Sequence, residues 1–171
     1  NDLDPGLTKM RQTLADGGTL PFTHVTKITD GVAEIFFSVA AALRGEATDD
    51  YTLIYSRIAE ALRADHVDAI LLSAELLEDM DQPALATRAY RRVPQDSPAF
   101  HVAELGRADA LRRSGRDDAA LEVLDGLAAT YGSLPIVQTT RGDLLRNMNR
   151  YVESVQAYDK ALSLYDENDP G

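Results

Sequence analysis

The residues best suited to acid–base or metal chemistry are three histidines and several clustered carboxylates. His24, His66 and His101 are far apart in the sequence. None has a second histidine three or four residues away, the spacing that places two metal ligands on one helix face. We expect these histidines on the surface or in turns. Glu75 and Glu78 lie one helical turn apart, but neighbouring acidic residues are typical of a solvated helix face.

Two further kinds of reactive motif are also missing from the sequence. Gly17 and Gly18 lack the additional glycine and the lysine that a phosphate-binding loop requires. No serine lies in the glycine-flanked turn that exposes a catalytic nucleophile. The sequence therefore predicts no catalytic residues, no metal site and no cofactor, and we expect a protein that is not an enzyme.

Composition limits the classes of partner. The 171 residues include 28 acidic and 17 basic ones, which gives a net charge of -11. This charge repels nucleic-acid phosphates and anionic lipid, so neither is expected as a partner. No apolar run approaches the ~20 residues that cross a bilayer, so no membrane insertion is expected. The 14 arginines against 3 lysines are typical of a GC-rich bacterial genome, and we expect a soluble protein of the bacterial cytoplasm or periplasm.

A pattern of small and large residues recurs every 34 residues and organises most of the chain. It is clearest between residues 135 and 168 and fits again, without insertion, one and two periods earlier. Small residues at matching positions allow two antiparallel helices to approach closely. The matching sets are Ala74, Ala108 and Gly142; Leu77, Leu111 and Leu145; Ala86, Ala120 and Ser154; Tyr90, Leu124 and Tyr158; Val93, Leu127 and Ala161.

This pattern resembles the tetratricopeptide repeat (TPR) family, whose unit is a helix–turn–helix of the same length. The resemblance implies an all-α fold, an α-α superhelix or TPR solenoid, in which each helical pair stacks on the next. It also implies that the first helix of each repeat lines a concave groove. The expected repeats are 33–66, 67–100, 101–134 and 135–168, followed by a tail at 169–171.

Residues 1–32 are expected to lie outside the repeats. Leu7 and Leu14 have helical spacing, and Gly17-Gly18 would end a short helix there. The stretch 19–29 favours an extended connector because it is rich in threonine and contains proline. Thr29 or Asp30 would then cap a helix over residues 32–43.

The second helix of the first repeat is expected over residues 51–64, and its phase is open by one residue. Its apolar stripe would consist of Tyr51, Tyr55, Ile58 and Leu62. The strict 34-residue register marks a different set of small positions: Thr52, Ser56 and Ala59.

The later helices are expected over residues 67–79, 83–93, about 98–113 and 117–130. Gly115 would form the turn of the third repeat. In the fourth repeat the turn falls at Asn147 to Asn149, because asparagine tolerates the left-handed conformation that such turns use.

The residues of the first helices that face away from the core would form the groove walls and bind the partner. They place acidic groups along the middle of the groove and arginines at one lip, an arrangement suited to a peptide with apolar anchors and charges of both signs. The set is Phe37, Ala41, Arg44, Asp68, Leu71, Glu75, Glu78, Asp79, Val102, Leu105, Asp109, Arg112, Arg113, Ile136, Thr139, Asp143, Arg146 and Asn147.

Three functions remain open. The first is a non-enzymatic scaffold that binds a protein or peptide in the groove. The second is self-association into a homo-oligomer through the uncovered last repeat or the 19–29 segment. The third is an accessory domain of a larger enzyme, because such repeats are often fused to catalytic domains.

Overall fold

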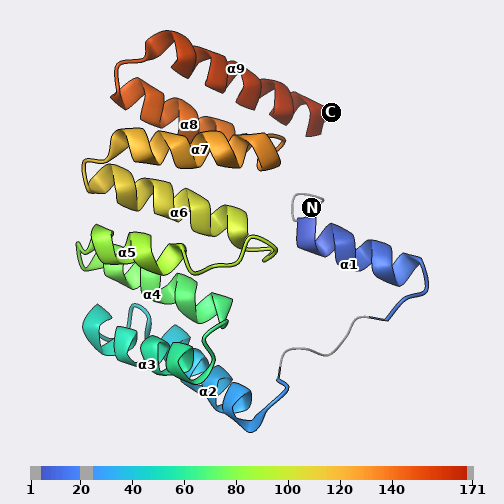
Figure 1. Cartoon of the computed structure of the whole chain (residues 1–171), viewed down its shortest axis with the longest axis vertical. Helices are drawn as coiled ribbons and strands as arrows, with labels where there is room; N and C mark the ends of the chain where they lie inside the picture. The colour runs from blue at the N-terminus through green and yellow to red at the C-terminus, as the bar shows by residue number, and fades with distance from the viewer. Residues whose placement is uncertain (1–4, 20–24, 169–171) are drawn as a thin grey trace. The chain divides into compact units, whose positions relative to one another are not determined.

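The computed structural model describes residues 5–19 and 25–168, and the regular secondary structure of these residues is α-helical (Figure 1). The chain divides into two compact units, Asn1–Phe100 and His101–Gly171, and each is described by itself. The helices are α1 Pro5–Ala15, α2 Ile28–Leu43, α3 Asp49–Leu62, α4 Val67–Asp79, α5 Pro83–Tyr90, α6 Phe100–Arg113, α7 Asp117–Tyr131, α8 Pro135–Asn147 and α9 Tyr151–Asn168.

Helix α1 confirms the short helix expected near the start of the chain. It is followed by Gly17, whose φ of 77° lies in the left-handed region that favours glycine. The part of the expected connector that covers residues 20–24 lies outside the described residues.

Helix α2 begins at Ile28, four residues before the expected start. The expected cap at Thr29 or Asp30 is wrong, since both residues lie inside the first turn. The Asp30 carboxylate instead accepts hydrogen bonds from the backbone N–H groups of Thr26 and Lys27, both at 2.9 Å. A carboxylate that reaches back in this way satisfies donors that the helix leaves unpaired.

In the first unit, α2, α3, α4 and α5 pack as successive neighbours. Ala40, Leu72 and Leu76 form a buried cluster, against which Phe37 and Leu53 are packed.

The strict 34-residue register correctly identifies the buried face of α3. Its residues Thr52, Ser56 and Ala59 are fully buried, and the Ser56 hydroxyl donates to the Ala69 carbonyl at 2.8 Å. The alternative stripe is wrong, because Tyr51 is exposed.

In the second unit, one buried cluster includes residues of α6, α7, α8 and α9. It contains Leu111 of α6, Leu124 of α7 and Leu145 of α8. Where α8 meets α9, a Cβ added at Gly142 would lie 2.7 Å from the Tyr158 ring. The small residue expected here is therefore needed for the tyrosine ring to pack against α8. Ser154 Oγ donates to the Gly142 carbonyl at 2.8 Å and ties the same two helices together.

The turns inside the later hairpins share one backbone conformation at 34-residue spacing. Asp81, Gly115 and Asn149 have φ values of 55°, 70° and 61°. This confirms the expected turns at Gly115 and near Asn149, and it adds Asp81, which the sequence did not single out. In each turn, the next backbone N–H bonds to a carbonyl five residues earlier: Gln82 to Leu77, Arg116 to Leu111 and Arg150 to Leu145.

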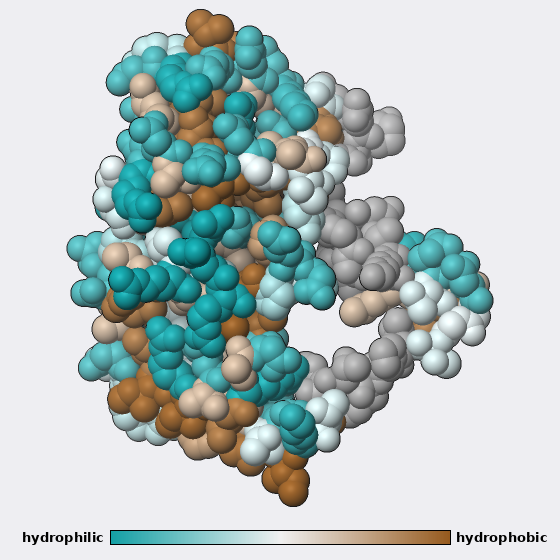
Figure 2. Space-filling model, in the orientation of Figure 1, coloured by the Kyte–Doolittle hydropathy of each residue, from teal (hydrophilic) through white to brown (hydrophobic). Residues whose placement is uncertain are grey.

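Apolar side chains are also exposed on α2 and on α9. On α2 these are Ile28, Val32, Ile35 and Val39, and Figure 2 shows hydrophobic surface over this part of the first unit. On α9 they are Val152, Val155, Leu162 and Tyr165.

Candidate partner-binding pockets

The first unit has a pocket of about 240 Å³ between α2 and α4, the first helices of the first two expected repeats. Arg44 Nη1 forms an ion pair with Glu75 Oε2, which joins the two helices across this pocket. The pocket is lined by Phe37, Ala41, Arg44, Asp68, Leu71, Leu72 and Glu75.

The second unit has a larger pocket, about 370 Å³, between α6 and α8, the first helices of the last two expected repeats. Three of its lining residues, Ala108, Leu124 and Leu144, are buried and provide an apolar floor. The rim is polar and consists of Asp109, Arg112, Thr140, Asp143, Arg146 and Asn147.

The charged residues of this rim are paired within their own helices. Arg112 donates from Nε and Nη2 to Asp109 Oδ1 at 2.9 and 2.7 Å. Arg146 Nη2 lies 3.3 Å from Asp143 Oδ1. The two helices therefore present the same carboxylate–guanidinium pair, 34 residues apart, on opposite sides of the pocket.

Tyr158 holds Asp143 in position. Its hydroxyl donates to Asp143 Oδ1 at 2.7 Å. Burial and this hydrogen bond to a carboxylate raise the pKa of Tyr158 above its ordinary value of 10.0, so the tyrosine remains a donor at neutral pH. Asp109 and Asp143 both accept these contacts at Oδ1.

Eleven of the predicted groove residues line one of the two pockets. Glu78 does not line a pocket; its carboxylate accepts a hydrogen bond from the Tyr90 hydroxyl at 2.7 Å. Leu105 packs against the core, and Arg113 is exposed outside the pocket. Thr139 donates to the Pro135 carbonyl at 3.1 Å, and Thr140 lines the pocket in its place. The eleven are Phe37, Ala41, Arg44, Asp68, Leu71 and Glu75 in the first unit, and Asp109, Arg112, Asp143, Arg146 and Asn147 in the second.

The floor residues were not predicted as part of the site. Ala108 and Leu124 occupy the small and large positions of the 34-residue pattern, which we assigned to packing between helices. They do pack there, and they also line the pocket although they are almost fully buried. The repeat register marks them as packing positions and does not indicate the pocket.

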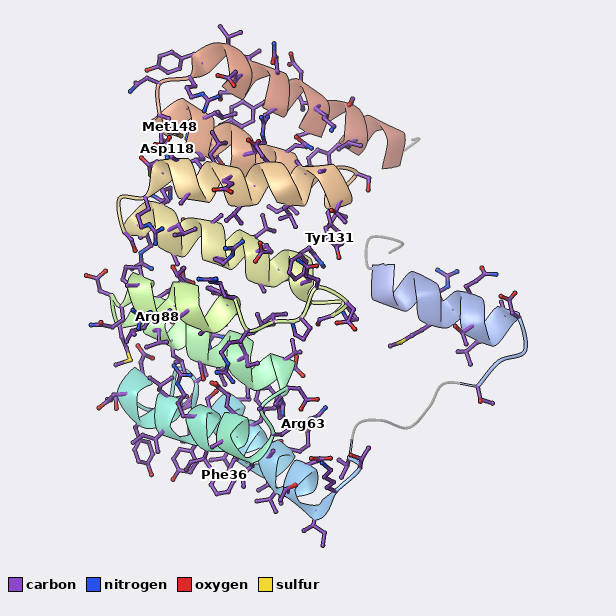
Figure 3. All side chains as sticks on the ribbon, viewed as in Figure 1. Phe36, Arg63, Arg88, Asp118, Tyr131 and Met148 are labelled. Carbon is purple, nitrogen blue, oxygen red and sulfur yellow. The ribbon has the colours of Figure 1, made fainter. Side chains whose placement is uncertain are left out.

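His66 lies in the turn between α3 and α4, as expected, where its backbone N–H donates to the Arg63 carbonyl at 3.1 Å, but its side chain is not on the surface. His66 is buried at the start of α4, where Nδ1 accepts the Ala69 N–H at 3.3 Å and Nε2 lies 3.4 Å from Glu34 Oε1. It caps a helix rather than lying on the surface. His101 lies beside the ring of Tyr131, with a centroid distance of 5.6 Å. Tyr131 is labelled in Figure 3. His24 lies outside the described residues.

Metal sites and membrane-spanning helices are two further possibilities. Among residues 5–19 and 25–168, no three histidine, aspartate or glutamate side chains gather closely enough to hold a metal ion. In the same part of the chain, every helix is too short or too polar to cross a membrane.

Solved structures share this architecture. The structure titled "MamA RS-1 ArsTM double mutant" matches with a TM-score of 0.71 at 15% identity, covering 100% of this chain and 99% of that chain. The chain is therefore a TPR-like helical solenoid. "MamA 41-end from Desulfovibrio magneticus RS-1" matches with a TM-score of 0.70 at 13% identity, covering 99% and 98% of the two chains.

A third structure, "Crystal structure of MamA", matches with a TM-score of 0.70 at 13% identity, covering 98% of this chain and 96% of that chain. Identities this low show the shared solenoid fold alone. No family model matches the sequence, and none of the curated proteins compared with it does.

Proposed function

We propose that this chain is a non-enzymatic scaffold that binds a protein or peptide partner along the first helices of its repeats. The observation that carries the proposal is the recurrence of one kind of pocket. Each unit has a concavity between two first helices, with apolar side chains at its base and paired charges at its rim.

The pocket of the second unit is the stronger binding element. Its volume of about 370 Å³ accommodates a large apolar side chain. An apolar anchor inserted there would bury its own surface against the floor formed by Ala108, Leu124 and Leu144, and burial of the anchor would supply most of the affinity. The charges of Asp109, Arg112, Asp143 and Arg146 would supply selectivity by rejecting partners with a mismatched charge pattern.

The pocket of the first unit differs because its rim charges pair across it. Arg44 and Glu75 belong to different helices and bridge the opening. A partner group that entered here would have to exchange with this ion pair. At the pocket of the second unit we therefore expect an apolar anchor. At the pocket of the first unit we expect a charged group that replaces one partner of the Arg44–Glu75 ion pair.

The test is a double exchange, Asp109→Arg with Arg112→Asp. It keeps the net charge and the three-residue spacing of the pair, so the fold is retained while the charge pattern of the rim is inverted. Partners captured from a bacterial lysate and quantified by mass spectrometry should fall at least about tenfold, as expected for misplaced charges at a desolvated contact.

The matched control is the exchange of Arg150 and Glu153, an exposed pair with an Nε–Oε1 distance of 2.7 Å that lies outside both pockets. This control should capture partners as the wild type does. Undiminished capture by the Asp109 and Arg112 exchange would refute the proposed site.

A further inference from the structure

The pocket of the first unit carries one unbalanced negative charge, which defines the group that it takes if the chain binds a partner there as proposed above. Three charged side chains line this pocket: Arg44 from α2, and Asp68 and Glu75 from α4. Arg44 forms an ion pair with Glu75. Within the described part of the chain, no basic side chain forms an ion pair with Asp68. The lining thus has one carboxylate more than it has cations.

The repeat register explains why the two pockets differ. In the second unit two carboxylates and two arginines line the pocket, so its charges balance. The counterpart of Arg112 one period earlier is Glu78, so α4 lacks an arginine of its own at this position. The sequence of α4 contains four acidic residues and no basic one. Glu75 therefore pairs with Arg44 of the neighbouring α2 instead.

Size and lining indicate that this pocket takes one long side chain. Its volume of about 240 Å³ is below the roughly 300 Å³ at which small-molecule pockets begin. Phe37 and Leu71 line it and are half-buried, so they offer apolar contact area. A basic side chain suits this combination, because its aliphatic stem packs on apolar surface while its charged head stays at a polar rim.

The sign of the incoming charge follows from what it leaves behind. The Arg44 and Glu75 side chains are 47% and 36% exposed, and exposed ion pairs contribute little, so either partner can be replaced. A cation would replace Arg44 at Glu75, and Asp68 would attract it as well. An anion would replace Glu75 at Arg44 and would then lie near two carboxylates without ion-pair partners. The pocket therefore favours a cation.

We propose that the pocket of the first unit binds an arginine side chain of the partner protein. The aliphatic stem packs on Phe37 and Leu71, and the guanidinium pairs with Glu75 in place of Arg44. Arginine is favoured over lysine because Arg44 already shows that a guanidinium reaches this carboxylate, and its planar fork donates two parallel hydrogen bonds to a carboxylate. Asp68 supplies the second negative charge that the incoming cation balances.

The experiment uses the full chain and a phage-displayed library of random heptapeptides. Peptides that bind the immobilised wild type but not the double variant Asp68→Asn with Glu75→Gln are sequenced and synthesised. Neither side chain is buried, so the variant should keep the helical circular dichroism spectrum and the melting temperature of the wild type. The selected peptides should be enriched in arginine next to an apolar residue.

Fluorescence anisotropy of one selected peptide then measures each contact. Replacing the arginine of the peptide by glutamine should raise the Kd at least about tenfold, and Asp68→Asn or Glu75→Gln alone should raise it at least about threefold. The matched control is Asp79→Asn, which removes the same charge from an exposed position on α4 outside the pocket. At about 0.15 M salt this control should bind as the wild type does, because distant surface charges are screened.

Three results would overturn the arginine pocket. The first is a selection that yields no arginine, including one that yields lysine or acidic residues in its place. The second is a selected arginine peptide whose Kd is unchanged by both Asp68→Asn and Glu75→Gln. The third is an equal loss of binding in Asp79→Asn, which would indicate attraction by the net charge of α4. Peptides that still bind in these cases would leave partner binding itself intact, and the exchange of Asp109 and Arg112 tests that function separately.

Discussion

Replacing Gly142 by alanine tests how α8 and α9 are held together. The new Cβ would lie 2.7 Å from Tyr158 Cε1 and 2.8 Å from Cδ1, distances that real Cβ atoms do not adopt. The tyrosine ring must move, and its hydrogen bond to Asp143 must stretch or break. Movement toward the next helical turn brings the hydroxyl to Arg146, which offers no acceptor.

The second repeat shows the alternative arrangement. Its equivalent residues are Ala74 and Tyr90, and there the tyrosine hydroxyl donates to Glu78 at 2.7 Å. Glu78 occupies the position that Arg146 occupies in the fourth repeat. An alanine is thus tolerated beside a tyrosine where a carboxylate lies one turn further along, and the fourth repeat lacks that carboxylate.

The magnitude follows from opposing terms. Alanine in a helix interior is favoured over glycine by about 1 kcal/mol. Overpacking costs roughly 1–3 kcal/mol, and the weakened hydrogen bond to a carboxylate adds about 1 kcal/mol for a partly exposed pair. We expect Gly142→Ala to lower the free energy of unfolding by about 1–3 kcal/mol, measured by urea denaturation followed by circular dichroism.

A second variant separates this mechanism from a general loss of stability. The third repeat combines Ala108 with Leu124, so Gly142→Ala together with Tyr158→Leu reproduces that pair in the fourth repeat. The double variant should be more stable than the sum of the single changes predicts, with a coupling of about 1–2 kcal/mol. A Gly142→Ala variant at least as stable as the wild type, or additive single changes, would refute the reasoning.

Two further predictions concern backbone and capping features. Hydrogen bonds from the Thr26 hydroxyl and backbone lower the pKa of Asp30 below 3.8, so its stabilising effect is complete above that pH and is lost as pH falls through the lower folded-state value. Asp30→Asn should remove this part of the acid dependence of the melting temperature, and an unchanged acid limb would contradict it. Asn149 has a φ of 61°, so Asn149→Ala should lower the free energy of unfolding, measured by urea denaturation, by about 1 kcal/mol. Asn149→Gly should change it by no more than about half of that amount. Equal stability of the alanine and glycine variants would argue against strain at this turn.

The periodic part of the fold was predictable because its period is set by packing. The bounds of α4 and the starts of α5 and α7 agree with the sequence interpretation, and Pro83 and Asp117 mark the last two of these starts clearly. The start of α2 was not predictable from composition. Asp30 stabilises it from inside the first turn, and its role depends on the direction of one side chain.

The pocket rims were predictable and their floors were not. Asp109 and Asp143 recur with the repeat on the outward face of a first helix, and the structure places both at one pocket. Leu124 and Leu144 have the burial expected of core residues, and sequence spacing does not indicate that a core residue also faces a cavity. The capping role of His66 was not predictable for a related reason, because it depends on the Ala69 N–H and leaves no sequence motif.

The shared conformation of Asp81, Gly115 and Asn149 has a consequence for building longer or shorter arrays. A segment excised between two of these turns begins and ends with the same backbone geometry, and it contains one complete second helix and one complete first helix. Such a cassette can be duplicated or removed by recombination at the turns without introducing a new loop. Chains of this type can thus change length in whole steps, which is a direct route to binding surfaces of different reach.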